Sequence, residues 1–243
     1  MVEALPSTRR PSPESVSAYV RAHHFGGFYG LLIDRLRDQQ TADPALTQLC
    51  PALQQAWEAE LIRASSAPAL AQSLVQTSRS AWRVGVRWEQ QLLRKRRLSV
   101  RQYLQSIVLK LSWIGASTEC LLLQSGDPLL AARFRRAYST LLICLQCSDD
   151  AHDQAEDRRL RGISFPEALG VSMDGLCHGA LRIARLSAPR VRSDGFFRIA
   201  DALEEQAAIL DRHYYGGSLL EMATSSNLLT AEWEALWKSQ EMP

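Results

Sequence analysis

Five carboxylate side chains follow an apolar run in the segment LLICLQCSDDAHDQAEDRRLRGISFP, residues 141–166. On a helix their spacings place them on one arc, because successive residues turn by about 100°. So many like charges on one arc destabilise a helix unless a cation neutralises them. Mg²⁺ binds carboxylate oxygens and shares its other positions with waters and substrate phosphates. The segment therefore predicts a Mg²⁺-diphosphate site with the metal ligands Asp149, Asp150, Asp153, Glu156 and Asp157.

A simpler alternative for this segment is a solvated helix face on which Arg158, Arg159 and Arg161 neutralise the acidic side chains. Residues 141–147 argue against it, because LLICLQC is too apolar for a surface helix. The acidic residues directly follow a stretch of helix that we expect to be buried. We therefore favour the metal site over the solvated face.

A second acidic pair, Asp34 and Asp38, ends the apolar run FGGFYGLLI near the start of the chain. The two residues lie one helical turn apart and share a face. Taken alone, the pair fits a solvated helix end that is linked to Arg35 and Arg37. Together with the later acidic segment, it predicts a second metal-binding wall.

Basic side chains supply candidates for binding an anion. Lys110 interrupts an apolar helix, and it either reaches a phosphate or extends to solvent. Arg212 and Tyr214 either cover a diphosphate or end a helix. Residues 94–97, RKRR, with Arg101 either attract an anionic substrate or complement the dipole at a helix end.

Hydrophobic periodicity and helix caps predict an all-α chain. No segment alternates like a strand, and no GxGxxG, phosphate-loop or GxSxG motif occurs. Gly26, Gly27 and Gly30 predict close packing or a cavity wall in the first helix. We expect a loose lead over residues 1–13 and one helical domain over residues 14–243. About eight helices are expected, over 14–39, 43–63, 67–97, 99–124, 128–160, 166–187 and 195–219, with a short one at the end.

Composition narrows the class of protein. The 243 residues are 46% hydrophobic and 22% charged, which suffices for one sizeable core. A net charge of +2 gives no reason to expect nucleic acid, and no run reaches the roughly 20 apolar residues of a membrane span. No apolar signal segment opens the chain, so we expect a cytoplasmic protein, with peripheral membrane association left open. Cys144 and Cys147 form a CxxC that we interpret as core, not zinc, because no second pair accompanies it.

The acidic segment resembles class I isoprenoid synthases, most closely the squalene/phytoene synthase-like branch. That branch carries Q-x-x-[ND]-x-x-x-D-x-x-E-D, followed by Gly and then Pro. By the same resemblance, Asp34 and Asp38 match the first DxxxD, and Tyr103 and Lys110 match a Tyr and a basic residue between the motifs. The chain is shorter than coupling synthases, and His152 replaces a typical Arg. The residues that match the long motif are Gln146, Asp149, Asp153, Glu156, Asp157, Gly162 and Pro166.

The resemblance implies an isoprenoid synthase-like bundle with a central cavity, two or three Mg²⁺ ions and a prenyl diphosphate substrate. We expect a terpene synthase or cyclase that ionises the substrate and releases pyrophosphate, as a monomer or homodimer. The alternatives are a prenyltransferase that couples two prenyl diphosphates and a non-catalytic helical binding protein. A phosphohydrolase built on His152 and Asp153 fits the spacing less well. The expected catalytic residues are Asp34, Asp38, Asp149, Asp153 and Asp157, and the expected diphosphate-binding residues are Lys110, Gln146, Arg212 and Tyr214.

Overall fold

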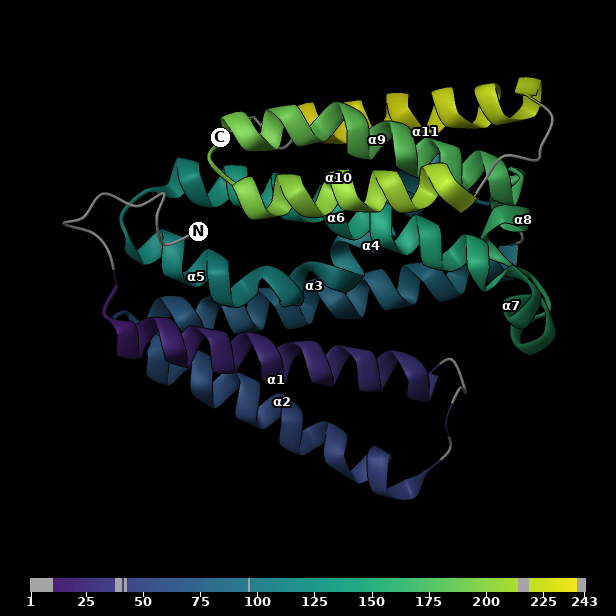
Figure 1. The fold of residues 1–243 in the computed structure, drawn as a ribbon. Helices are drawn as coiled ribbons and strands as arrows, with labels where there is room; N and C mark the ends of the chain where they lie inside the picture. Colours follow the sequence, from purple (N-terminus) through teal and green to yellow (C-terminus); the bar gives the residue numbers. More distant parts are fainter. Residues whose placement is uncertain (1–10, 38–40, 42, 96, 214–218, 240–243) are drawn as a thin grey trace. The chain divides into compact units, whose positions relative to one another are not determined.

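The computed structural model describes residues 11–37, 41, 43–95, 97–213 and 219–239 (Figure 1). These residues form helices and contain no strand, which confirms the all-α prediction for them. The chain divides into two compact units. We call Val2–Trp82 with Leu111–Ala131 the N-terminal unit, and Arg83–Lys110 with Ala132–Pro243 the C-terminal unit. The expectation of one domain over residues 14–243 stays a prediction.

Helices α1, α2 and α5 and the 3-10 helix η3 belong to the N-terminal unit, together with the first part of α3. In this unit α1 packs along α2 and also contacts η3 and α5. The bounds are α1 Pro13–Arg37, α2 Pro44–Ala64, α3 Pro68–Lys95, η3 Ser112–Gly115 and α5 Ala116–Gln124.

The C-terminal unit holds the rest of α3 and the helices that carry the long acidic segment. Helix α9 packs against both α10 and α11 (Figure 1). The bounds are α4 Val100–Leu111, α6 Pro128–His152, α7 Gln154–Arg161, α8 Phe165–Leu169, α9 Met173–Ser193, α10 Phe197–His213 and α11 Leu219–Ser239.

Local capping sets the ends of the helices that carry the candidate site. The backbone N–H of Gln102 donates to Ser99 Oγ at 3.2 Å, which starts α4. The N–H of Leu130 donates to Asp127 Oδ1 at 2.8 Å, which starts α6. Gly162 ends α7 in the left-handed conformation, with φ at 73°, which glycine adopts without steric cost. These three boundary signals are confirmed.

Several expected helices are subdivided, so the structure contains more helical segments than the eight predicted. The stretch 99–124 becomes α4, η3 and α5, and the stretch 128–160 is divided at Asp153 into α6 and α7. The prediction of a loop at 187–195, between two helices, is wrong, because α9 continues through Pro189 to Ser193. A proline inside a helix costs about 3 kcal/mol. Burial of Ala188 and Val191 on the same helix offsets this cost.

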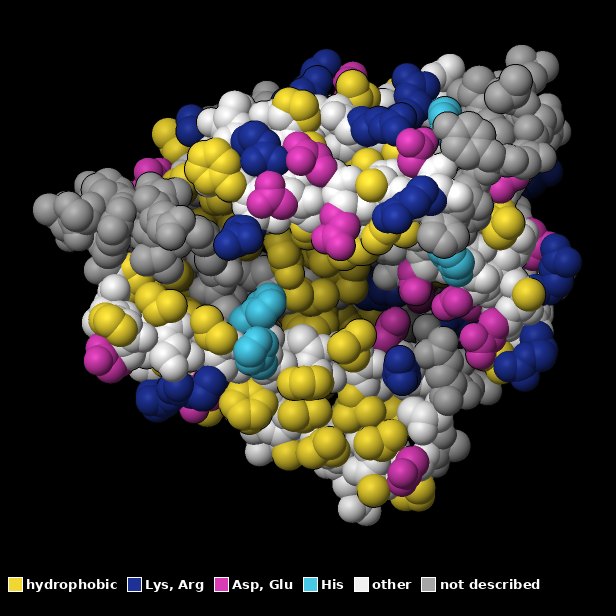
Figure 2. Space-filling view, in the orientation of Figure 1, with side chains coloured by type: hydrophobic (Ala, Val, Ile, Leu, Met, Phe, Trp, Pro, Cys, Tyr) yellow, Lys and Arg dark blue, Asp and Glu magenta, His cyan; other side chains and the backbone are white. Residues whose placement is uncertain are grey.

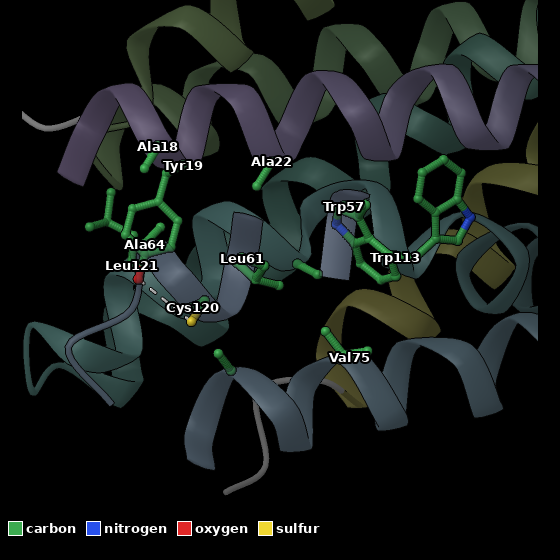
Figure 3. Packing of buried hydrophobic residues seen from close by; sticks show 12 residues of the cluster. Ala18, Tyr19, Ala22, Trp57, Leu61, Ala64, Val75, Trp113, Cys120 and Leu121 are labelled. Carbon is green, nitrogen blue, oxygen red and sulfur yellow. Dashed lines mark hydrogen bonds between the residues drawn. The ribbon is translucent and has the colours of Figure 1, made fainter. Parts of the chain in front are cut away.

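The core of the N-terminal unit explains two of the three glycines in α1. A Cβ on Gly30 would lie 1.7 Å from an indole carbon of Trp113, and a Cβ on Gly26 would lie 3.0 Å from Trp57. Nothing lies within 4 Å of a Cβ on Gly27. Close packing is therefore confirmed for Gly26 and Gly30 but not for Gly27. Figure 3 shows Trp57 and Trp113 side by side in this core.

One stretch, Val100–Gln124, is long and apolar enough to cross a membrane on length and composition alone. More than half of its most apolar part is buried inside the protein, and the core helix of a soluble protein meets the same criterion. The expectation that no segment spans a membrane stays a prediction.

Candidate functional site

The acidic segment leaves the core of the C-terminal unit along α6 and continues into α7. Leu142, Ile143, Cys144 and Cys147 are buried, as expected for the apolar run that precedes the carboxylates. Acidic side chains, with arginines beside them, gather at the end of the unit where α7 lies (Figures 1 and 2). The helix that presents the carboxylates is thus anchored by its own buried face.

The structure divides the five carboxylates between two environments. Asp150 and Asp157 are 5% and 7% exposed, whereas Asp149 is exposed and Asp153 and Glu156 are half-buried. Residues 150 and 157 are two turns apart on one side of the helix, and residues 149, 153 and 156 follow the adjacent side. The spacing predicts one arc of five similar carboxylates, but the structure buries two of them, Asp150 and Asp157, at one edge of that arc.

Asp150 is the centre of a buried hydrogen-bond network. Its Oδ2 accepts from the hydroxyl of Tyr103 at 2.6 Å, and its Oδ1 accepts from Nε2 of Gln146 at 2.8 Å. Burial raises the pKa of Asp150 to about 7, although the charge of Lys110 and both hydrogen bonds act to lower it. Burial, and then the charge of Asp150, raise the pKa of Tyr103 well above its usual value. Two partners therefore hold this carboxyl away from solvent.

A buried ion pair lies close to Asp150. Gly85 lets α3 approach α4 closely, because a Cβ there would lie 2.6 Å from the backbone nitrogen of Lys110. One turn farther along α3, Oε2 of Glu89 lies 3.0 Å from Nζ of Lys110, with side chains 5% and 7% exposed. The electrostatic effect of Lys110 on Asp150 links this pair to the acidic helix.

Asp157 is engaged by an arginine of its own helix. Its Oδ1 lies 3.5 Å from Nη1 of Arg161, one turn later in α7. Its backbone N–H donates to the carbonyl of Asp153 at 2.8 Å, so helical hydrogen bonding continues across the break between α6 and α7. Asp157 therefore stabilises α7 through one ion pair and one backbone hydrogen bond. Its role as a metal ligand stays a prediction.

The remaining carboxylates are available to solvent. Asp149 Oδ2 lies 3.5 Å from Nε2 of Gln146, and Glu156 forms a surface ion pair with Arg159 at 3.6 Å. Asp153 forms no ion pair with any residue that the structure describes. Within those residues, no three His, Cys, Asp or Glu side chains are placed to hold one metal ion. Mg²⁺ commonly binds one or two protein carboxylates and completes its shell with water and phosphate oxygens, and Asp149 and Asp153 fit that pattern.

Other predicted site residues lie in different settings. Asp34 is half-buried near the end of α1, and Asp38 and Tyr214 lie outside the described residues. Lys110 faces Glu89 within the protein, and no phosphate contact is needed to explain it. Nε of Arg212 donates to the carbonyl of Ala208 at 3.1 Å, so this arginine satisfies the last turn of its own helix.

The sequence interpretation missed Glu89. A signal was present, because Glu89 is the one acidic residue between Glu60 and Glu119. A solitary carboxylate in a stretch rich in arginine indicates a specific partner, although the sequence alone does not say which cation it meets.

The cysteines confirm the core interpretation. Cys144 and Cys147 are free and buried, and burial raises the pKa of both thiols.

Comparisons of the chain with protein-family models, curated proteins and solved structures find no match.

Proposed function

We propose that the protein is a Mg²⁺-dependent class I enzyme that ionises a prenyl diphosphate and releases pyrophosphate. The observation that carries this proposal is the pair Asp149 and Asp153. Asp149 lies near the end of α6 and Asp153 lies one turn later, at the break before α7, and both are accessible to solvent. The other side of α6 is anchored in the core. The motif that begins at Gln146 supports the proposal, because it has the spacing of the squalene/phytoene synthase-like branch.

Asp149 and Asp153 would hold the metal. The family resemblance assigns Asp34 and Asp38 to a second acidic pair, which stays a prediction from the sequence. When bound, Mg²⁺ supplies charge that neutralises the diphosphate and the negative charge that develops on the leaving group. Gln146 positions this site, because its amide lies between the carboxylates of Asp149 and Asp150.

The proposed reaction needs no external oxidant or reductant. The bond between the allylic carbon and the bridging oxygen breaks, and its electron pair leaves with pyrophosphate. The carbocation loses a proton to form a hydrocarbon, or it adds water and then loses a proton to form an alcohol. A water-excluding apolar environment favours the first outcome, because water would otherwise trap the cation.

Two alternatives to this reaction remain. A prenyltransferase would use the cation to alkylate a second prenyl diphosphate, and the resemblance to coupling synthases favours this version. A non-catalytic helical protein would use the acidic side of α6 and α7 to bind a basic partner. The exposed acidic side chains favour that version, but it assigns no role to Mg²⁺.

The test compares pyrophosphate release by the wild type and by Asp153→Asn, with Mg²⁺ and a C15 prenyl diphosphate. Loss of a charged group that acts on the leaving group should lower kcat/KM by about a hundredfold or more. Glu205→Gln is the matched control, because Glu205 is an exposed carboxylate of α10 without an ion pair among the described residues. Equal activity of both variants would refute the assignment of Asp153, and product analysis separates a cyclised or linear terpene from a coupled product.

A further inference from the structure

Five exposed arginines, which we call the arginine stripe, follow one another from α3 to the start of α4. Arg83, Arg87, Arg94, Arg97 and Arg101 are all exposed. None of these five arginines forms an ion pair with a residue that the structure describes. By contrast, arginines of α9 such as Arg185, Arg190 and Arg192 each have a carboxylate partner. Within the described part of the chain, no carboxylate therefore offsets the charge of the stripe.

The geometry of α3 turns these arginines into a line. Steps of four and seven residues separate Arg83, Arg87 and Arg94, so all three lie on one helix face along about 16 Å. Val84, beside them, is 47% exposed. Glu89 lies on the opposite face, where it is buried and paired with Lys110. No carboxylate on α3 interrupts the positive face.

Charge is strongly segregated in the sequence as well. The segment Arg83–Lys110 carries eight basic residues and one acidic residue. The rest of the chain carries 20 basic and 25 acidic residues, a net charge of −5, although the whole protein has a net charge of +2. The net positive charge of the protein therefore comes from this one segment, whose own net charge is +7.

A solvated helix end does not account for the whole stripe. Cations near a helix C-terminus are stabilised by the macrodipole, and this effect falls off within the last turn. Arg94 lies in that turn of α3, whereas Arg87 and Arg83 lie eight and twelve residues before Lys95. Their exposure, with no ion-pair partner among the described residues, needs a different explanation.

We propose that this arginine stripe docks on the surface of a membrane rich in anionic lipids. A line of cations on one helix face suits a flat, negatively charged surface, and clusters of four to eight basic residues are typical of such contacts. An exposed valine beside the arginines also suits the interfacial region. Single-stranded nucleic acid fits less well, because its binding proteins present aromatic side chains for base stacking, and Trp88 within this stretch is half-buried. The inference does not rest on the proposed chemistry.

The experiment measures co-sedimentation of the full chain with vesicles of phosphatidylcholine, with and without anionic phosphatidylglycerol. The wild type should bind the anionic vesicles only, and salt at about 0.5 M should release it, because the Debye length shrinks to a few ångströms. Each arginine near an anionic surface contributes about a fivefold factor. The triple variant Arg83→Gln/Arg87→Gln/Arg94→Gln should therefore lower the partition coefficient by about a hundredfold.

The matched control is Arg185→Gln/Arg190→Gln/Arg192→Gln, which removes the same net charge from ion-paired arginines of α9. It should bind anionic vesicles within a few-fold of the wild type. Circular dichroism confirms that both variants are folded. The proposal is overturned if the control loses as much binding as the stripe variant, or if neutral vesicles bind equally well. It is also overturned if the wild type binds a single-stranded oligonucleotide but not the vesicles.

Discussion

The packing of α1 makes a sharp prediction about two glycines that lie three residues apart. Gly30→Ala places a methyl group 1.7 Å and 1.9 Å from two carbons of the Trp113 indole. Trp113 is buried, and its ring packs edge-on against Tyr29 and Trp57, with ring centroids 5.9 Å and 6.2 Å away. Overpacking of such a site costs about 3 kcal/mol. Alanine regains about 1 kcal/mol of helix propensity, so the net loss of unfolding free energy is about 2 kcal/mol.

Gly27→Ala is the matched control on the same helix. Nothing lies within 4 Å of the added methyl group, so the gain in helix propensity remains and stability rises by about 0.5–1 kcal/mol. Urea and thermal unfolding, followed by tryptophan fluorescence and circular dichroism, measure both changes. At about 2–4 °C per kcal/mol, the two variants should shift Tm in opposite directions. A rise in stability for Gly30→Ala would refute the packing described for α1.

A double-mutant cycle then identifies the cause. Trp113→Phe removes the part of the indole that the Gly30 methyl group meets. Combined with Gly30→Ala, it should cost less than the sum of the two single substitutions, with a coupling energy of about 1 kcal/mol or more. If the losses of unfolding free energy of the two single variants simply add, the effect of Gly30→Ala does not come from contact with Trp113.

Two further predictions concern the buried charges of the C-terminal unit. The pKa of Asp150 is about 7 in the folded protein and near 4 in the unfolded chain. Between these values the folded state binds more protons, so this group's contribution to the unfolding free energy falls as pH rises from about 4 to about 7 and then levels off. Asp150→Asn should flatten that dependence in urea unfolding with a metal chelator present, and an unchanged slope would contradict it. Lys110→Met removes the cation that lies 3.0 Å from the buried Glu89 carboxylate, and breaking a buried ion pair in this way costs about 3–5 kcal/mol. The double variant with Glu89→Leu should recover most of that loss in the same assay, and no recovery would exclude the ion pair as its cause.

The fold class and several boundaries follow from local signals. Asp127 and Gly162 mark helix ends through capping and left-handed geometry, which depend on a few neighbouring residues. Pro189 misled the interpretation, because burial of Val191 outweighs the proline's local preference. Tertiary packing decided that boundary, and periodicity does not contain this information.

In the candidate site, too, some features follow from local sequence and others from tertiary packing. Periodicity placed Asp149, Asp150 and Asp153 near one another around a helix, but it did not say which of them faces the core. The buried carboxylate of Asp150 accepts a hydrogen bond from Tyr103, which lies 47 residues earlier in the chain. The partner of Lys110 is likewise on another helix, at Glu89. Such pairings follow from how helices pack and not from their sequence spacing.

The most direct test of the proposed function is the release of pyrophosphate from C10, C15 and C20 prenyl diphosphates by purified protein, with Mg²⁺ and with a chelator. The proposal predicts release with at least one chain length, only when Mg²⁺ is present, and its loss in Asp153→Asn. Folded protein that releases no pyrophosphate from any of the three substrates would contradict the proposal and favour a non-catalytic helical protein.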